Sequence, residues 1–198
     1  MATGELALDA AGRFLAVRVK AEANYGAYVS MFAPTIATTG MAKVISGLYR
    51  IPAIRLDFNC AFTNPVPGDA IRGAGKPESL FLLERLVDIA AHETGRSPIE
   101  LRRLNLLRLE DMPYAAASGY TYDAADCVRL FETALRHADA TGFEARRTAS
   151  ERVGKRRGLG LSCHLHGTSG IADVHVVVQV EPDRLVARLG TQSQGQGH

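Results

Sequence analysis

The sequence contains no tryptophan and only three cysteines among its 198 residues. Cys60, Cys127 and Cys163 are odd in number and far apart, which argues against a disulfide framework and favours a reducing compartment, with the cytoplasm as the default. Their spacing is not that of metal ligands. Because Cys60 and Cys163 lie in apolar, strand-like runs, we expect both to be small buried hydrophobic residues.

The sequence also lacks a strong charge of one sign and a long apolar run. Its 23 basic and 21 acidic residues give a net charge of +2, and the basic residues are scattered, so no nucleic-acid footprint is predicted. The one dense basic cluster, Lys155-Arg156-Arg157, is typical of a solvated linker. No apolar stretch reaches the length of a membrane span, and residues 1–5 lack the start of a signal peptide.

Two regions have the alternating pattern of β-strands. Residues 5–30 predict a hairpin with its turn at 9–13, and residues 49–63 predict a long strand. The Gly-, Ala-, Ser- and Thr-rich segment 25–48 predicts a surface loop with a short helix. Asn64-Pro65-Val66-Pro67-Gly68-Asp69 then ends the second strand region.

Helical spacing and capping residues predict three helices, over about 77–93, 98–107 and 123–138. The polar segment 140–157 predicts a linker, and strands are expected again at 158–165, 174–180 and 185–189. The predicted fold is therefore α+β: a mixed sheet plus three helices, then the start of a second β-rich substructure, with a boundary near residue 150.

A glycine-hinged basic loop, Arg72-Gly73-Ala74-Gly75-Lys76-Pro77-Glu78, leads into the first helix. A second glycine loop runs from Gly190 to His198. The first is not a dinucleotide fingerprint, because Glu78 stands where the third glycine should be. The second is not a phosphate-binding P-loop, because Gln196-Gly197 replaces the required lysine and hydroxyl residue.

Both loops suit a polar, anionic ligand. Glycines let successive N–H groups converge on an anion, a helix start adds partial positive charge, and Arg72 offers a planar charged fork. Gln192, Gln194 and Gln196 could bind a heterocycle with mixed polar edges. The alternative is a structural glycine-rich turn whose Arg72 pairs with Glu78 or Glu84.

Motifs along the chain resemble the molybdopterin-binding large subunit of the xanthine dehydrogenase/aldehyde oxidase family, the molybdenum hydroxylases. They occur in family order: Phe62-Thr63-Asn64, Ala70-Ile71-Arg72-Gly73-Ala74-Gly75-Lys76-Pro77-Glu78, Glu84-Arg85-Leu86-Val87-Asp88, Leu101-Arg102-Arg103-Leu104-Asn105, Met112-Pro113-Tyr114, Gly119-Tyr120-Thr121-Tyr122-Asp123 and Gly195-Gln196-Gly197-His198. The resemblance implies two parts: residues 1–145 as part of a first molybdopterin-binding domain, and 155–198 as the start of a second.

The resemblance also implies roles for individual residues. Arg72 matches the active-site arginine that orients substrate and stabilises developing negative charge. Ala70, Gly73, Ala74 and Gly75 would form backbone contacts to the pterin and the surroundings of the metal. Gln194, Gly195, Gln196 and Gly197 would hold the pterin dinucleotide. The implied reaction is hydroxylation of an aldehyde or N-heterocycle with water as oxygen donor. Electrons would leave through [2Fe–2S] clusters and FAD on a small iron–sulfur subunit and a medium FAD-binding subunit.

The sequence departs from the family pattern in several ways. The upstream G-G-x-F-G loop and the downstream G-x-G-E segment with the general-base glutamate are absent, so we expect the isolated chain to need the rest of a large subunit, or a split partner chain, for activity. A catalytically inactive remnant with a structural or assembly role is the alternative. Gly73 replaces the cysteine of the copper-containing carbon monoxide dehydrogenases, which argues against copper–molybdenum chemistry.

Other candidate residues have simpler explanations. His164, His166 and His175 are expected to be ordinary strand-face histidines, since no fourth metal ligand is evident. Asp123 and Asp126 are better explained as helix-capping carboxylates than as acid/base catalysts.

Overall fold

The computed structural model describes residues 1–166, 174–191 and 195. The chain forms two compact units, Met1–Leu165 and His166–His198. The first unit contains a sheet with helices and the second contains a hairpin, so the predicted α+β class is confirmed.

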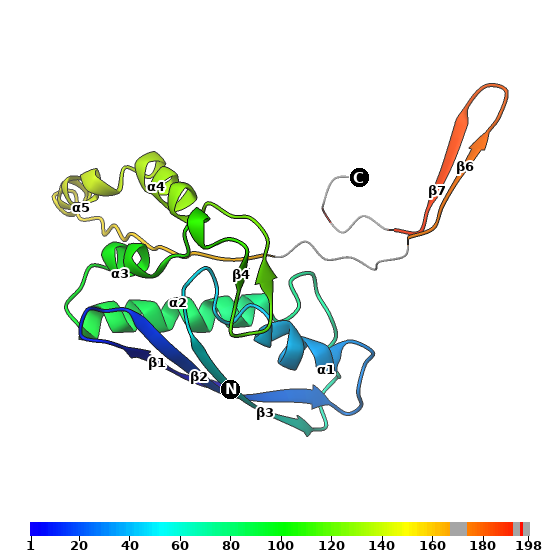
Figure 1. The fold of residues 1–198 in the computed structure, drawn as a ribbon, viewed down its shortest axis with the longest axis horizontal. Coiled ribbons are helices and arrows are strands. Elements are labelled where there is room, and N and C mark those ends of the chain that lie inside the picture. Colours follow the sequence, from blue (N-terminus) through cyan, green and yellow to red (C-terminus); the bar gives the residue numbers. More distant parts are fainter. Residues whose placement is uncertain (167–173, 192–194, 196–198) are drawn as a thin grey trace. The chain divides into compact units, whose positions relative to one another are not determined.

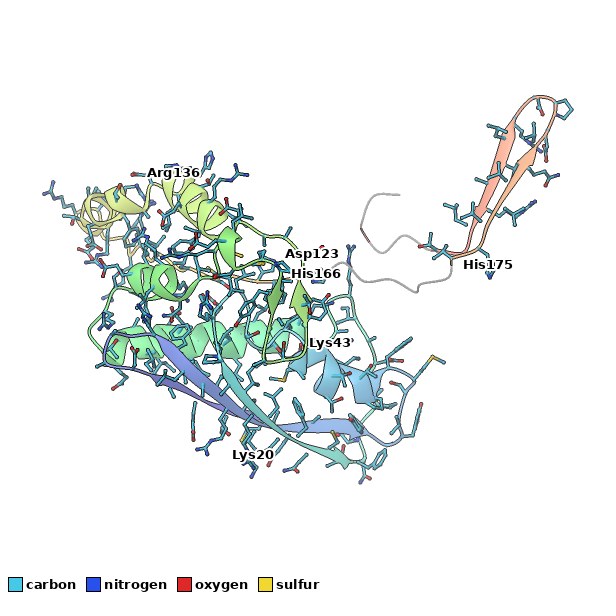
Figure 2. All side chains as sticks on the ribbon, viewed as in Figure 1. Lys20, Lys43, Asp123, Arg136, His166 and His175 are labelled. Atoms are coloured by element: carbon cyan, nitrogen blue, oxygen red, sulfur yellow. The ribbon has the colours of Figure 1, made fainter. Side chains whose placement is uncertain are left out.

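Three strands form the sheet of the first unit, in the order β1-β2-β3 (Figure 1). β1 (Ala2–Leu8) pairs antiparallel with β2 (Phe14–Gly26), which confirms the predicted hairpin. β3 (Ala53–Phe62) runs parallel to β2, so the sheet is mixed. Along β2, buried residues such as Val17 and Val19 alternate with exposed ones, because one face packs on the core and the other meets solvent. Lys20 projects from that outer face (Figure 2).

The three predicted helices are present. α2 (Lys76–Glu93) packs against β1 and against α3 (Pro98–Asn105). The hydroxyl of Ser97 caps α3 by accepting two backbone N–H groups at 3.2 and 3.4 Å. Asp126 caps α4 (Cys127–His137) by accepting the N–H of Arg129 at 3.0 Å, as predicted.

The remaining elements of the first unit are short. They are α1 (Ala33–Thr35), the π-helical turn η1 (Ile36–Gly40), the 3-10 turn η2 (Leu109–Asp111), the two-residue strands β4 (Tyr114–Ala115) and β5 (Thr121–Tyr122), the 3-10 turn η3 (Ala140–Gly142) and α5 (Phe143–Glu151). β4 and β5 pair antiparallel with each other.

The prediction of a surface loop over 25–48 is wrong for its second half. Met41, Val44, Ile45 and Leu48 are buried in the core, together with the following Tyr49. The segment forms turns and a short helical stretch whose apolar side chains belong to the same hydrophobic core as residues of β2 and α2. Its apolar side chains decide its position, despite its many small and polar residues.

The predicted linker and the strand after it also need correction. Part of 140–157 is helical as α5, and 158–165 forms no strand. Cys163 lies in the hydrophobic core of the first unit, so this segment packs there, and the compact units divide after Leu165 rather than near residue 150. The assignment of 1–145 and 155–198 to two molybdopterin-binding domains remains a prediction.

The second unit contains one antiparallel hairpin, β6 (Val176–Val180) paired with β7 (Leu185–Leu189), as predicted. Its strand residues are exposed except for Val186, which is half-buried. A lone two-stranded hairpin is marginally stable in water.

The cysteines are all free thiols. Cys127 and Cys163 are buried, but Cys60 is exposed, so its predicted burial is wrong. Cys60 lies near the end of β3, where every residue from Asn59 to Phe62 is exposed. Within the part of the chain that the structure describes, no helix has both the length and the apolar content needed to cross a bilayer.

Candidate cofactor site at the start of helix α2

The loop that leads into α2 has three consecutive residues with positive φ. These are Gly73 at +114°, Ala74 at +33° and Gly75 at +86°. Glycine adopts such angles without a steric penalty, whereas Ala74 is strained. Two tight turns hold the loop: the N–H of Ala74 donates to the carbonyl of Ile71 at 3.0 Å, and that of Lys76 donates to Gly73 at 3.1 Å.

The π-helical turn η1 and the residue after it, Met41, pack against this loop. Gly75 is buried, and a Cβ there would lie 2.3 Å from the carbonyl oxygen of Ile36 and 2.7 Å from the amide nitrogen of Met41. One turn into α2, the buried hydroxyl of Ser79 donates to the carbonyl of Met41 at 2.6 Å. The loop is therefore held against η1, and position 75 accepts only glycine in this arrangement. Nothing in the sequence pattern marked η1 as the support for the loop.

Three N–H groups of this loop have no hydrogen-bond partner among the described residues: those of Gly73, Gly75 and Glu78. An unpaired donor on a buried residue such as Gly75 is costly, so it is expected to meet a ligand or water. The amide of Ala70, by contrast, donates to the carboxylate of Asp69 at 2.6 Å. The loop thus offers donors to an anion at Gly73, Gly75 and Glu78, at the positive end of an 18-residue helix.

Arg72 and Ile71 are exposed at the rim of the loop, with Ile71 82% exposed. Arg72 directly precedes Gly73 in the sequence, so its guanidinium adds a permanent positive charge near the start of the helix. The donors, the helix end and the arginine all favour a negatively charged or strongly polar ligand. This is the ligand class predicted from the sequence.

The carboxylate of Glu84, one of the two acidic partners considered for Arg72, is the centre of a buried network. Its Oε1 accepts the hydroxyl of Tyr49 at 2.6 Å. Its Oε2 accepts Nε of Arg102 at 3.0 Å and the N–H of Cys163 at 2.9 Å. Glu84 thus joins three segments of chain that are far apart in sequence.

Arg102 completes the network from α3. Its side chain is fully buried and also donates to Asp88 at 2.9 Å, to the carbonyl of Leu161 at 3.1 Å and to the carbonyl of Pro98 at 3.2 Å. These bonds connect α2, α3 and the segment 158–165. The network has a structural role: it holds α2, the helix that follows the loop, against α3 and the segment 158–165.

Burial changes the acidity of two groups in this network. Burial and the neighbouring charge of Glu84 raise the pKa of Tyr49 well above its ordinary value. Burial, together with the same carboxylate, raises the pKa of the Cys163 thiol to about 11. Tyr49 and Cys163 are therefore neutral at pH 7, and Cys163 is a poor nucleophile.

Sequence reasoning did not identify this network, although a signal was present. Glu84 and Asp88 are four residues apart on α2, and Glu84 falls next to the apolar positions Leu83 and Val87. A carboxylate on the buried face of a helix needs a buried cation. Only the fold shows that this cation is Arg102.

The second predicted loop lies in the other unit and is described only in part. Gly190 closes the hairpin by donating its N–H to the carbonyl of His175 at 2.9 Å. Gly195 is exposed with φ +92°. Gln194, Gln196 and Gly197 fall outside the described residues. A ligand site shared by Arg72 and this loop therefore remains a prediction.

The described residues 1–166, 174–191 and 195 contain no group of three or more His, Cys, Asp or Glu side chains that could hold a metal ion. His164 and His175 are exposed.

Comparison with known proteins assigns the family. Residues 1–106 match the model of the molybdopterin cofactor-binding domain, and this match includes the whole loop and α2. The chain belongs to the xanthine dehydrogenase/aldehyde oxidase family of molybdopterin-binding proteins. The resemblance inferred from the sequence is confirmed.

Individual relatives match nearly the whole of this chain. It is 34% identical to the gamma subunit of the 6-hydroxypseudooxynicotine dehydrogenase complex of Paenarthrobacter nicotinovorans, over 98% of this chain and 25% of that subunit. It is 32% identical to the carbon monoxide dehydrogenase large chain of Hydrogenophaga pseudoflava, over 98% of this chain and 26% of that chain. The crystal structure of quinoline 2-oxidoreductase from Pseudomonas putida 86 superposes with a TM-score of 0.83 at 26% identity, covering 98% of this chain and 27% of that one. The chain spans about a quarter of the length of these relatives.

Proposed function

We propose that the chain binds a molybdenum–molybdopterin cofactor, in its dinucleotide form, at the loop before α2. The observation that carries the proposal is the set of N–H groups on Gly73, Gly75 and Glu78 that have no partner among the described residues, inside the segment that matches the family model. Ala70 and Ala74 would line the same loop. Gln194, Gly195, Gln196 and Gly197 would bind the dinucleotide.

When bound, the cofactor supplies hydroxylation of a substrate carbon with water as the oxygen donor. The protein residues supply placement and charge. Arg72 would orient the substrate through its planar guanidinium and stabilise the negative charge that develops on it. The positive end of α2 acts in the same direction, and Gly75 keeps the loop close enough to η1 for its amides to keep one geometry.

An N-heterocycle is the substrate class that we favour over an aldehyde. The structural relative quoted above is a quinoline 2-oxidoreductase, and quinoline is an N-heterocycle. An aldehyde remains the alternative, since an aldehyde oxidoreductase of Megalodesulfovibrio gigas is 31% identical over 79% of this chain. Gly73 provides no sulfur, which argues against copper chemistry despite the similarity to a carbon monoxide dehydrogenase chain.

Activity requires partners. The relatives are named as one subunit of a complex or as a large chain. We infer that this chain works with the remainder of a large subunit, or with a split partner chain, and with an FAD-binding medium subunit and an iron–sulfur small subunit.

A chimera tests the proposal. The matching quarter of the Paenarthrobacter gamma subunit is replaced by this chain and expressed with the other subunits of that complex, and molybdenum per complex and substrate oxidation are measured. We expect a molybdenum-containing active complex. Arg72→Ala should keep the metal and lower kcat about 100-fold or more, whereas Arg85→Ala, an exposed arginine on α2, should change neither. A complex that assembles fully but contains no molybdenum would contradict the proposal.

A further inference from the structure

Gly40, the last residue of η1, meets the loop before α2 at one peptide group. A Cβ on Gly40 would lie 2.7 Å from the carbonyl oxygen of Ala74 and 3.6 Å from the carbonyl carbon. The oxygen is much the nearer of the two atoms, so the carbonyl group of Ala74 points at Gly40. A side chain at position 40 would displace this carbonyl.

The direction of this carbonyl also sets the direction of an N–H donor. The peptide group between Ala74 and Gly75 is trans, and the C=O and N–H bonds of a planar trans peptide point in opposite directions. Because the carbonyl of Ala74 points at Gly40, the N–H of Gly75 points away from it. This N–H is one of the three loop donors that have no partner among the described residues.

The local backbone does not favour this orientation by itself. Ala74 is strained at φ +33°, whereas Gly75, at φ +86°, can adopt many conformations. A strained conformation persists where the surrounding structure holds it in place. Here the surrounding structure is η1, so the contact with Gly40 is the feature that selects the orientation of the peptide.

The π-helical form of η1 brings backbone rather than side chains against the loop. Ile36 and Met41 are five residues apart, which is the spacing of a π-helical hydrogen bond. A Cβ on Gly75 would lie 2.3 Å from the carbonyl oxygen of Ile36 and 2.7 Å from the amide nitrogen of Met41. Gly75 therefore packs on the backbone at both ends of the turn, while Gly40 packs on the peptide before Gly75. Single π-helical turns often occur at functional sites.

We propose that Gly40 is a positioning residue for the cofactor site: it holds the peptide group between Ala74 and Gly75 so that the N–H of Gly75 is directed at the ligand. The inference rests on the proposed function, because the ligand is the cofactor assigned to this loop. Gly40 itself touches no ligand in this account and acts through the peptide.

Crystal structures of the wild-type chain and of Gly40→Ala test the orientation without any cofactor. The new Cβ would also lie 2.9 Å from the carbonyl oxygen of Thr35, so the variant is first checked for a wild-type circular dichroism spectrum. We expect the carbonyl of Ala74 to point at Gly40 in the wild type and to turn away in the variant. Gly68→Ala, at an exposed glycine with open space for a Cβ, is the control and should leave this peptide unchanged.

Amide NMR during titration with molybdopterin dinucleotide tests the consequence for binding. Loss of one hydrogen bond to a charged ligand should weaken binding by Gly40→Ala about tenfold or more. Gly68→Ala should bind as the wild type does.

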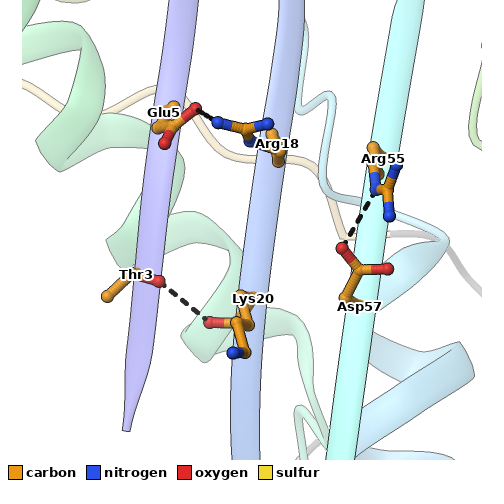
Figure 3. A pocket seen from close by; sticks show the side chains of 6 residues that line it. All are labelled: Thr3, Glu5, Arg18, Lys20, Arg55 and Asp57. Carbon is orange, nitrogen blue, oxygen red and sulfur yellow. Dashed lines mark hydrogen bonds and ion pairs between the residues drawn. The ribbon is translucent and has the colours of Figure 1, made fainter.

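A groove on the outer face of the sheet provides an internal control for adventitious anion binding (Figure 3). It has a volume of about 360 Å³ and is lined by Thr3, Glu5, Arg18, Lys20, Arg55 and Asp57. Arg18 pairs with Glu5, and Arg55 pairs with Asp57. A cofactor that binds the loop before α2 should leave the amides of Arg18 and Arg55 unshifted.

The outcomes separate this inference from the proposed function. If the wild type and Gly40→Ala bind the cofactor equally well, the inference is overturned and the proposed function stands. If the wild type shows no shifts in the loop, or shifts only in the outer groove, the proposed function fails, and the crystal structures alone decide whether Gly40 orients the peptide.

Two further structural results would overturn the inference. One is a wild-type carbonyl of Ala74 that points away from Gly40, and the other is a carbonyl that keeps its direction in Gly40→Ala. If Gly40→Ala does not fold, the crystal structure of Ala74→Gly replaces it. Glycine at position 74 removes the strain, so the carbonyl should still point at Gly40 if that contact sets the peptide, and a carbonyl that turns away also overturns the inference.

Discussion

Replacing Arg102 by alanine should destabilise the first unit far more than the same change at its neighbour Arg103. The side chain of Arg102 is fully buried, and its removal leaves the carboxylate of Glu84, only 7% exposed, without its cation. Breaking a buried pair on one side costs about 3–5 kcal/mol. Arg103 pairs with Glu132 where both side chains are partly exposed, 45% and 34%, so its loss should cost about 1 kcal/mol or less.

The measurement is the free energy of unfolding from urea titration, followed by circular dichroism, for the wild type and both variants. Total stability is typically about 5–15 kcal/mol, so Arg102→Ala should remove a large share of it. The variant should also expose the segment 158–165 to proteolysis, since Arg102 holds the carbonyl of Leu161. Equal losses from the two arginine variants would refute the view that the Glu84 network fixes α2.

Three further outcomes are expected. Gly75→Ala should lower the free energy of unfolding, measured by urea titration, by at least about 1–3 kcal/mol, because φ is +86° and the new Cβ would lie 2.3 Å from a carbonyl oxygen. Gly95→Ala should lower it less, because φ is +64° there and the space around the new Cβ is open. In native protein, a thiol reagent should modify Cys60 quickly and Cys127 and Cys163 only after unfolding; rapid modification of all three would contradict their burial. Burial raises the pKa of Cys163 to about 11, so the buried neutral thiol contributes fully to stability below pH about 9, and this contribution is lost as the pH rises to about 11. The free energy of unfolding should therefore fall over that interval, and fall less in Cys163→Ala.

The elements with a clear period were predictable from sequence. Strict alternation identified β2 and β3, and the apolar face with a following glycine identified α2. Their pairing was not predictable, because parallel contact between β2 and β3 depends on the segment that crosses between them. The loop itself was located from its glycines. Gly73 and Gly75 have positive φ angles, which glycine adopts because it has no Cβ.

The elements that depend on distant contacts were missed. Met41, Val44, Ile45 and Leu48 have helical spacing, but Gly40 and Gly47 interrupt the segment and suggested a surface loop.

The segment 158–165 has the composition of a strand, yet it forms none. A strand needs a neighbour with free backbone groups, and here side chains of Glu84 and Arg102 bind the backbone at Cys163 and Leu161. Such side-chain partners cannot be read from local sequence.

The central claim is that the loop before α2 binds the cofactor, and amide NMR of the 21.3 kDa chain during titration with molybdopterin dinucleotide tests it most directly. We predict saturable shifts of the Gly73, Gly75 and Glu78 amides, which persist in both Arg72→Ala and Arg85→Ala. Shifts confined to other segments, or no shift at these three amides at the highest concentration reached, would contradict the account.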